Sequence, residues 1–197
     1  MKKISSLIKD HLQRFLPEGN HMQSALSYGV DMALYTILST AGLLLICLLM
    51  NSLIFGIIII ATCYLNQTIG GGYHASTHAR CFLSMALFLV LGIVFCKLNI
   101  PELALYSMGT ISIVVLFMQP VVLHPNRSFL KNRLPFFTKR SRCIIAFELL
   151  IIFVFAITGS QLLNAFIIAL VLSAISRIAA KHSKHCNADF CDGSRGE

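Results

Sequence analysis

The feature that most limits the fold is a long stretch without charged side chains. Between Asp31 and Arg80 the chain has no Lys, Arg, Asp or Glu, and residues 32–65 are almost entirely apolar. One membrane crossing needs roughly 20 apolar residues. Residues 32–65 are therefore long enough for two crossings, joined by a tight turn near Asn51 and Ser52. Because backbone polar groups in hydrocarbon have to be satisfied locally, an open chain crosses the membrane as helices.

The remaining sequence extends this interpretation to an all-α integral membrane protein. The chain is 56% hydrophobic and only 12% charged, about half the charged fraction of a typical soluble domain. We expect one polytopic domain over residues 1–180 with about six transmembrane helices. The expected crossings lie at about 32–50, 52–66, 79–96, 101–123, 143–157 and 162–178.

The two ends of the chain have a different character. Residues 1–17 predict an amphipathic helix in the membrane interface, because apolar side chains recur there at helical spacing and the charged ones fall mostly on the other side. A soluble helix that covers the bundle is the alternative. No cleavable signal peptide is expected, since this segment lacks a continuous apolar core. Residues 181–197 predict a polar cytoplasmic tail, for which disorder is favoured over a metal site.

The distribution of positive charge predicts the orientation. Six crossings place both termini on one side, and all but one of the 16 Lys and Arg residues fall on that side; the exception is Lys97. By the positive-inside rule, both termini, residues 67–79 and the loop at 119–142 are cytoplasmic. The net charge of +8 therefore marks topology, and no motif points to a nucleic-acid partner.

A polar segment, Gly70-Gly-Gly-Tyr-His-Ala-Ser-Thr-His-Ala-Arg-Cys81, interrupts the apolar sequence. It brings His74 close to Cys81, and a His/Cys pair is the chemistry of thiol proteases: the imidazole takes the thiol proton and the thiolate attacks a carbonyl. Three successive glycines free the backbone to fold His74 toward the thiol. A cytoplasmic position also keeps a catalytic thiol reduced.

The spacing of the pair sets a condition on the local fold. On one continuous helix, residues seven apart lie about 10.5 Å apart along the axis, too far for a hydrogen bond. The pair therefore requires a break, with His74 in a loop and Cys81 in the first turns of the next helix. That helix is expected to begin near Ser76 or Thr77, either of which can cap it. A helix N-terminus also stabilises a thiolate.

Two other functions remain open at this point. His74, His78 and Cys81 would share a helix face and form an acceptable zinc triad, although no nearby Glu could act as base. A peptide exporter or channel is the non-enzymatic alternative, but its crossings would need more polar residues than these contain. The four cysteines in or beside apolar runs fit small hydrophobic roles: Cys47, Cys63, Cys96 and Cys143. We expect no cofactor and no metal.

The motif Gly71-Gly-Tyr-His-Ala75, followed by Arg80-Cys-Phe82, resembles the AgrB family of bacterial membrane endopeptidases. The similarity extends to the size, the amphipathic start, the six crossings and the basic loop before the fifth. It implies a cysteine peptidase of the bacterial cell membrane, with His74 and Cys81 as its catalytic residues. Its substrate would be an AgrD-like quorum-sensing pro-peptide: the acidic C-terminal tail is cleaved, an acyl-enzyme forms, and the peptide closes into a thiolactone or lactone. A homodimer is compatible with the resemblance.

Other residues are candidates for supporting this reaction. Family members often carry an arginine shortly before the glycines, where this chain has Gln67; Arg80 is the nearby cation. The basic loop, residues 120–142, is expected to bind anionic lipid headgroups and to attract the acidic tail of the pro-peptide. The candidate substrate-binding residues are Gly71, Gly72, Gln67, Arg80, Arg127, Lys131 and Arg133.

No Asp accompanies the pair to orient His74. Asn66, Gln67 and Glu148 are the candidates for that role. Glu148 lies inside the fifth expected crossing, where an ionisable residue is by default a functional hypothesis. A side chain that extends to the membrane interface is the alternative.

Overall fold

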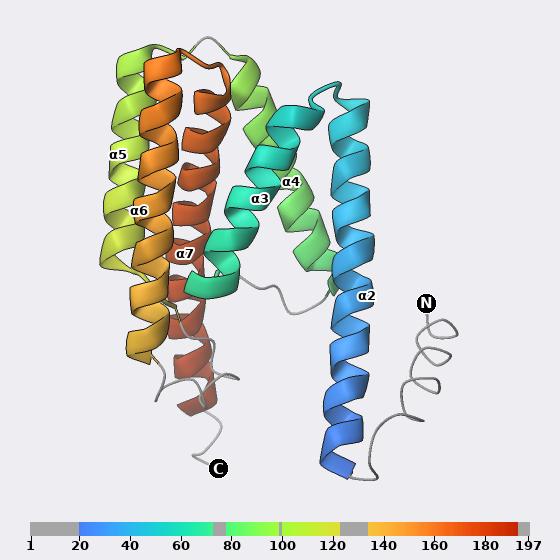
Figure 1. Cartoon of the computed structure of the whole chain (residues 1–197). Helices are drawn as coiled ribbons and strands as arrows, with labels where there is room; N and C mark the ends of the chain where they lie inside the picture. Colours follow the sequence, from blue (N-terminus) through green and yellow to red (C-terminus); the bar gives the residue numbers. More distant parts are fainter. Residues whose placement is uncertain (1–19, 73–77, 99, 123–133, 193–197) are drawn as a thin grey trace. The chain divides into compact units, whose positions relative to one another are not determined.

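The structure is a computed structural model. It describes the backbone of residues 20–72, 78–98, 100–122 and 134–192, and the side chains of these residues except 20–28, 32, 78 and 183–192. The described residues form six α-helices and no strand (Figure 1), which confirms the all-α class. The helices are α2 (Asn20–Leu49), α3 (Leu53–Gly70), α4 (His78–Lys97), α5 (Glu102–Met118), α6 (Leu134–Thr158) and α7 (Leu162–Asp192).

Five of these helices are long and apolar enough to cross a membrane, and α5 is a shorter apolar helix. This agrees with the expectation of about six transmembrane helices. The expected amphipathic helix at residues 1–17 lies outside the described residues.

The chain divides into two compact units, residues 1–46 and residues 47–197. The described part of the first is the greater part of α2, whose membrane-length segment is Gly29–Leu49. The second unit contains α3 to α7 and the candidate site.

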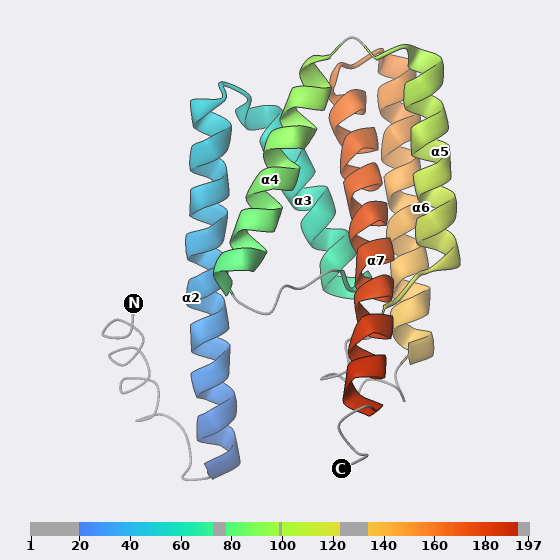
Figure 2. The same ribbon diagram turned by 180° about the vertical axis from the view of Figure 1, so that it is seen from behind.

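Helix α7 is the centre of the second unit. It packs against α3, α4, α5 and α6, and Figures 1 and 2 show it beside these helices from both sides. Its inward positions include the fully buried Ala165 and Ala169, and also Ala174. Small residues let neighbouring helices approach closely, which in lipid replaces the hydrophobic driving force between helices.

Larger side chains fill the spaces around α7. One buried cluster joins Leu116, Ile145 and Leu170 from three helices. A second joins Leu105, Leu163 and Ile167. Many other large apolar side chains, among them Ile111 and Phe153, point outward, as expected for surfaces that face lipid.

The turn expected between the first two crossings is present. Helix α2 ends at Leu49 and α3 begins at Leu53. Asn51 has a φ of 49°, a left-handed conformation that Asn tolerates better than most residues. The amide of Ser52 donates to the carbonyl of Cys47 at 3.0 Å, and its hydroxyl donates to the carbonyl of Met50 at 3.0 Å.

Five helix boundaries differ from the expected crossings by four residues or more. Helix α2 begins earlier, at Asn20, and α6 begins earlier, at Leu134, whereas α3 and α7 continue to Gly70 and Asp192. Helix α5 ends at Met118 rather than near residue 123, because the residue before a proline, here Pro120, disfavours the helical conformation. Apolar length alone set the expected boundaries, but a helix continues past the hydrocarbon wherever its sequence allows. Pro135 lies in the first turn of α6, the one helical position where proline is well tolerated. The basic loop is therefore helical from residue 134 onward, and the expected polar tail is helical through Asp192.

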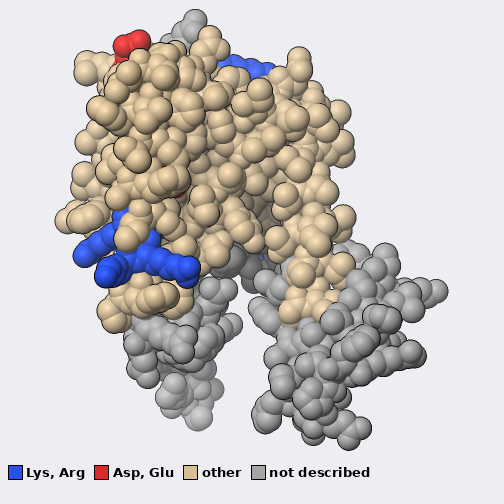
Figure 3. All heavy atoms as spheres, viewed as in Figure 1, with Lys and Arg blue, Asp and Glu red and all other residues tan. Residues whose placement is uncertain are grey.

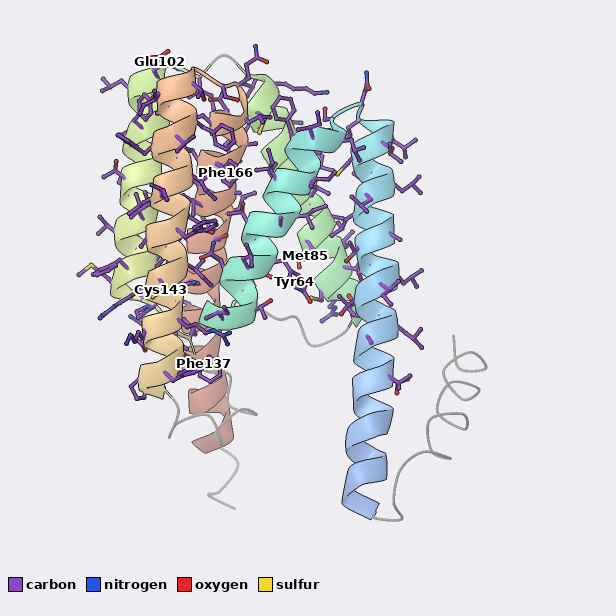
Figure 4. The ribbon with its side chains drawn as sticks, in the orientation of Figure 1. Tyr64, Met85, Glu102, Phe137, Cys143 and Phe166 are labelled. Atoms are coloured by element: carbon purple, nitrogen blue, oxygen red, sulfur yellow. The ribbon has the colours of Figure 1, made fainter. Side chains whose placement is uncertain are left out.

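The two ends of the second unit differ in charge. The end of α3, the start of α4, the end of α5 and the start of α6 lie at one end of the unit (Figure 1). Lys and Arg gather there on the surface over α5 and α6 (Figure 3), where Lys139, Arg140 and Arg142 are exposed. Glu102 lies at the opposite end from Phe137 (Figure 4). At Glu102's end, Lys97 donates to the carbonyl of Met50 at 2.9 Å.

Candidate active site

The polar segment falls at a break between two helices. Helix α3 ends at Gly70 and α4 begins at His78. The expected break is therefore present, and the start of α4 is one residue beyond the predicted cap positions. Ser76 and Thr77 lie outside the described residues, so their capping role stays a prediction.

Residues 70–72, the glycine segment, leave α3 in a conformation that requires glycine. Gly71 has φ 74° and ψ 164°, a region that is essentially restricted to glycine. Its amide still donates to the carbonyl of Gln67 at 3.0 Å, and the amide of Val122 donates to the carbonyl of Gly70 at 2.7 Å. The glycine segment is thus hydrogen-bonded to Val122, at the start of the basic loop.

The other two glycines leave space for neighbouring side chains. A Cβ on Gly72 would lie 2.9 Å from the hydroxyl oxygen of Ser176 and 3.0 Å from Cγ of Gln67. A Cβ on Gly70 would collide with the guanidinium of Arg177. A different local contact or conformation therefore favours glycine at each of the three positions.

Cys81 is the fourth residue of α4. It is a free thiol and is partly buried. Its carbonyl accepts a hydrogen bond from the hydroxyl of Ser84 at 2.9 Å. The first four amides of a helix have no partner within it, and those of α4 begin at His78. Cys81 consequently sits where backbone donors and the helix dipole favour negative charge.

Several predicted residues lie outside the described part of the chain. His74 is among them, as are Arg127, Lys131 and Arg133, and the side chain of His78 is also undescribed. The His74–Cys81 pair therefore stays a prediction, as does binding of the pro-peptide tail by these three cations. Arg80 is exposed beside Cys81 at the start of α4.

Gln67 lies next to Gly72 and links the glycine segment to α4, the helix that carries Cys81. Its amide nitrogen is 3.4 Å from the hydroxyl oxygen of Ser176 and 3.8 Å from the sulfur of Met85. Met85 is one turn along α4 from Cys81 and lies between α3 and α4 (Figure 4). Gln67, a neutral amide, thus lies between the glycine segment, α7 and the helix that carries Cys81.

Asn66 and Glu148 form a buried pair. The side-chain amide of Asn66 donates to Oε1 of Glu148 at 2.6 Å and to the carbonyl of Thr62 at 3.2 Å. Glu148 is only 3% exposed. The alternative of a side chain that extends to the interface is therefore wrong for Glu148, which points into the bundle.

Arg177 is the residue that the sequence interpretation missed. Counted there as one more cytoplasmic cation, it is in fact 1% exposed and the largest fully buried side chain described. Its guanidinium donates to Oδ1 of Asn66 at 3.2 Å and to the hydroxyl of Ser141 at 3.4 Å. A signal was present in the sequence, because Arg177 falls inside the last expected crossing, residues 162–178, where an ionisable residue is by default a functional hypothesis.

The exposed cations of α6 pack on aromatic rings. The guanidinium of Arg142 lies 5.0 Å from the ring centroid of Phe117, and that of Arg140 lies 5.6 Å from Phe136. Such cation–π contacts leave the charge at the surface. These side chains are therefore available to anionic partners at the end of the unit that carries Cys81.

The other described cysteines fall into two groups. Cys47 and Cys63 are buried, whereas Cys96 and Cys143 are partly or fully exposed, and all four are free thiols. Cys63 lies 3.7 Å from the carbonyl oxygen of Ala169, as a small core residue would. Within the described ranges, no group of three His, Cys, Asp or Glu side chains could hold a metal ion. The zinc alternative includes His74 and His78, so this observation does not test it.

Comparison with known proteins gives one result. The family model described as "AgrB: Accessory gene regulator B" matches residues 1–177. Neither the curated proteins nor the solved structures that were searched contain a match.

Proposed function

Because the chain belongs to the accessory gene regulator B family, whose members take part in processing quorum-sensing peptides, we propose that it is a cysteine endopeptidase of the bacterial cell membrane. Its substrate is an AgrD-like pro-peptide, its nucleophile is Cys81 and its base is His74. The observation that carries this proposal is the helix break, with α3 ending at Gly70 and α4 beginning at His78. A break between the two helices is the condition that the seven-residue spacing of the pair sets.

The first half of the reaction releases the tail of the pro-peptide. His74 takes the proton of the Cys81 thiol, and the thiolate attacks the carbonyl carbon of the scissile peptide bond. Backbone amides in the first turn of α4 stabilise the oxyanion of the tetrahedral intermediate. The imidazolium of His74 then protonates the leaving nitrogen, the C–N bond breaks, and the remaining peptide is held as a thioester on Cys81.

The second half closes the ring. A Cys thiol or Ser hydroxyl of the bound peptide gives its proton to His74 and attacks the thioester carbonyl. The new S–C or O–C bond forms, and the bond to Cys81 breaks. A thiolactone or lactone is released, and the proton returns to the Cys81 thiolate. Because the chain itself supplies both the acid–base group and the nucleophile, this proposal needs no cofactor.

Charge at the same end of the unit supports recruitment of an acidic tail. Lys139, Arg140 and Arg142 are exposed there, and Arg127, Lys131 and Arg133 belong to the same basic loop. Opposite charges raise the local concentration and association rate of a ligand. By the positive-inside rule we place this end, and with it the active site, in the cytoplasm, beside anionic lipid headgroups.

The test is cleavage of the pro-peptide by variants reconstituted in liposomes. Cys81→Ala, Cys81→Ser and His74→Ala should each abolish release of the tail, measured by mass spectrometry. Cys143→Ala and His182→Ala are matched controls, since both replace exposed side chains of the same residue types that have no part in the proposed reaction, and they should cleave normally. Full activity of Cys81→Ala would refute the proposal. Chelator-sensitive activity that is lost equally in His74→Ala, His78→Ala and Cys81→Ala would replace it with the zinc mechanism.

A further inference from the structure

The guanidinium of Arg177 joins the ends of two helices. One terminal nitrogen, Nη1, donates to the carbonyls of Leu116, Gln119 and Pro120 at 3.2, 3.0 and 3.1 Å. The other, Nη2, donates to the carbonyl of Asn66 at 3.2 Å. Helix α5 ends at Met118 and α3 ends at Gly70. One side chain therefore satisfies carbonyls near both C-termini, where positive charge is also favoured by the helix dipoles.

The guanidinium also lies directly against the glycine segment. The guanidinium occupies the space that a side chain on Gly70 would need. Directly beside it, the amide of Val122 donates to the carbonyl of Gly70 at 2.7 Å. Residues 70–72 and 119–122 are thus held together by the bond between Val122 and Gly70. Arg177 adds bonds to the end of α3, which precedes residues 70–72, and to the carbonyls of Gln119 and Pro120.

Each of these two segments leads directly into part of the proposed machinery. His74 follows Gly72 by two residues, and Arg127 follows Val122 by five. Arg177 thus bonds to residues that come shortly before the proposed base and shortly before the proposed tail-binding cations. Neither role requires Arg177 to contact the substrate.

The buried charge is compensated through Asn66, which accepts from Arg177 and donates to Glu148. A buried charge is costly unless it is paired and hydrogen-bonded. An apolar side chain of similar volume often stabilises a protein as well as a buried ion pair does. A buried arginine in a membrane helix is accordingly a functional hypothesis rather than a requirement of packing.

We propose that Arg177 is a positioning residue: it holds the glycine segment, which leads to the proposed base, against residues 119–122, which lead into the basic loop. The planar guanidinium is essential because its two terminal nitrogens serve different segments. Lysine would keep the charge but concentrate it at one point.

The first experiment measures this tie without any substrate. Hydrogen exchange of the reconstituted protein is followed by mass spectrometry in Arg177→Lys and in Arg177→Met/Glu148→Gln, where the second change removes the uncompensated carboxylate. The hydrogen-bonded amides of Gly71, Gln119 and Val122 should exchange faster in both variants, whereas those near the turn between α6 and α7 should not change. The matched control is Arg140→Met, which removes an exposed arginine and should leave both segments as they are. Unchanged exchange in residues 70–72 and 119–122 would overturn the proposal, as would faster exchange throughout the protein.

The second experiment rests on the proposed function. In Arg177→Lys, the rate constant for alkylation of Cys81 by iodoacetamide should fall by on the order of tenfold, and KM for the pro-peptide should rise by a similar factor. A smaller folded fraction would lower amplitudes but leave the rate constant and KM unchanged. If both stay within about twofold of the unmodified protein, the positioning role is refuted. If the unmodified protein cleaves nothing while exchange still responds to Arg177, the proposed function fails and the tie between the two segments stands.

Discussion

Alanine substitutions at three glycines separate two costs, backbone strain and loss of space. Gly71 bears both, since its φ is 74° and a Cβ there would collide with the carbonyl oxygen of Val122. Gly159 has a φ of 62° but open space around it, and Gly29 has open space and no positive φ. Alanine should therefore meet both strain and collision at Gly71, strain alone at Gly159, and neither at Gly29.

The expected magnitudes follow from these differences. Strain in an unusual backbone region costs about 1–3 kcal/mol, and forcing atoms into a packed site costs about 1–3 kcal/mol more. The carbonyl of Val122 is backbone and cannot rotate away, so Gly71→Ala should destabilise the protein by about 4 kcal/mol. Gly159→Ala should cost about 1–2 kcal/mol. Gly29→Ala, inside α2, should stabilise the helix by about 0.5–1 kcal/mol.

The assay is thermal unfolding of the purified variants in detergent, followed by circular dichroism. For a chain of this size about 1 kcal/mol shifts Tm by roughly 2–4 °C, so Gly71→Ala should lower Tm by roughly 10 °C. Gly159→Ala should lower it by roughly 4 °C and Gly29→Ala should raise it slightly. A Gly71→Ala variant no less stable than Gly159→Ala would show that Val122 does not pack against the glycine segment, and would refute the geometry on which the site is built.

Three further predictions concern the buried pair, the basic loop and the orientation. Asn66→Leu should destabilise the protein by about 3 kcal/mol in the same unfolding assay, because it leaves Glu148 and Arg177 unlinked in the interior; a neutral effect would contradict the described network. KM for an acidic-tailed pro-peptide should rise as NaCl is increased, while a substrate with an uncharged tail should show no such dependence; equal salt dependence would exclude electrostatic recruitment. A membrane-impermeant thiol reagent added outside intact cells should not label Cys186 or Cys191, and strong labelling of either would reverse the proposed orientation.

Patterns within short stretches of sequence predicted the membrane helices and the helix break. The uncharged run predicted two helices with a turn near Asn51. Both the length needed to cross the hydrocarbon and the conformational tolerance of Asn can be judged from a short stretch of sequence. The break before Cys81 was expected from three successive glycines and the spacing to His74. The early start of α6 was missed, since Lys139, Arg140 and Arg142 interrupt the apolar sequence within its first nine residues and only Pro135 marked the helix start.

Tertiary packing determined what the sequence interpretation missed. Glu148 lies in a membrane helix, and only its contact with Asn66, far away in the sequence, distinguishes an inward side chain from one that reaches the interface. Arg177 was counted as a topological charge because it follows an apolar segment. Its actual position depends on carbonyls of α3 and α5 that no local pattern relates to it. The freedom of Gly71 was expected, but its contact with Val122 was not.

The most direct test of the central claim is to trap the covalent intermediate. A pro-peptide whose ring-closing Cys or Ser is replaced by Ala cannot cyclise, so the acyl-enzyme should accumulate after tail release. Intact mass measurement of the reconstituted protein should then show an added mass equal to the peptide without its tail, and peptide mapping should locate it on Cys81. Release of the tail with no adduct, or an adduct on another residue, would contradict the assignment of Cys81 as the nucleophile.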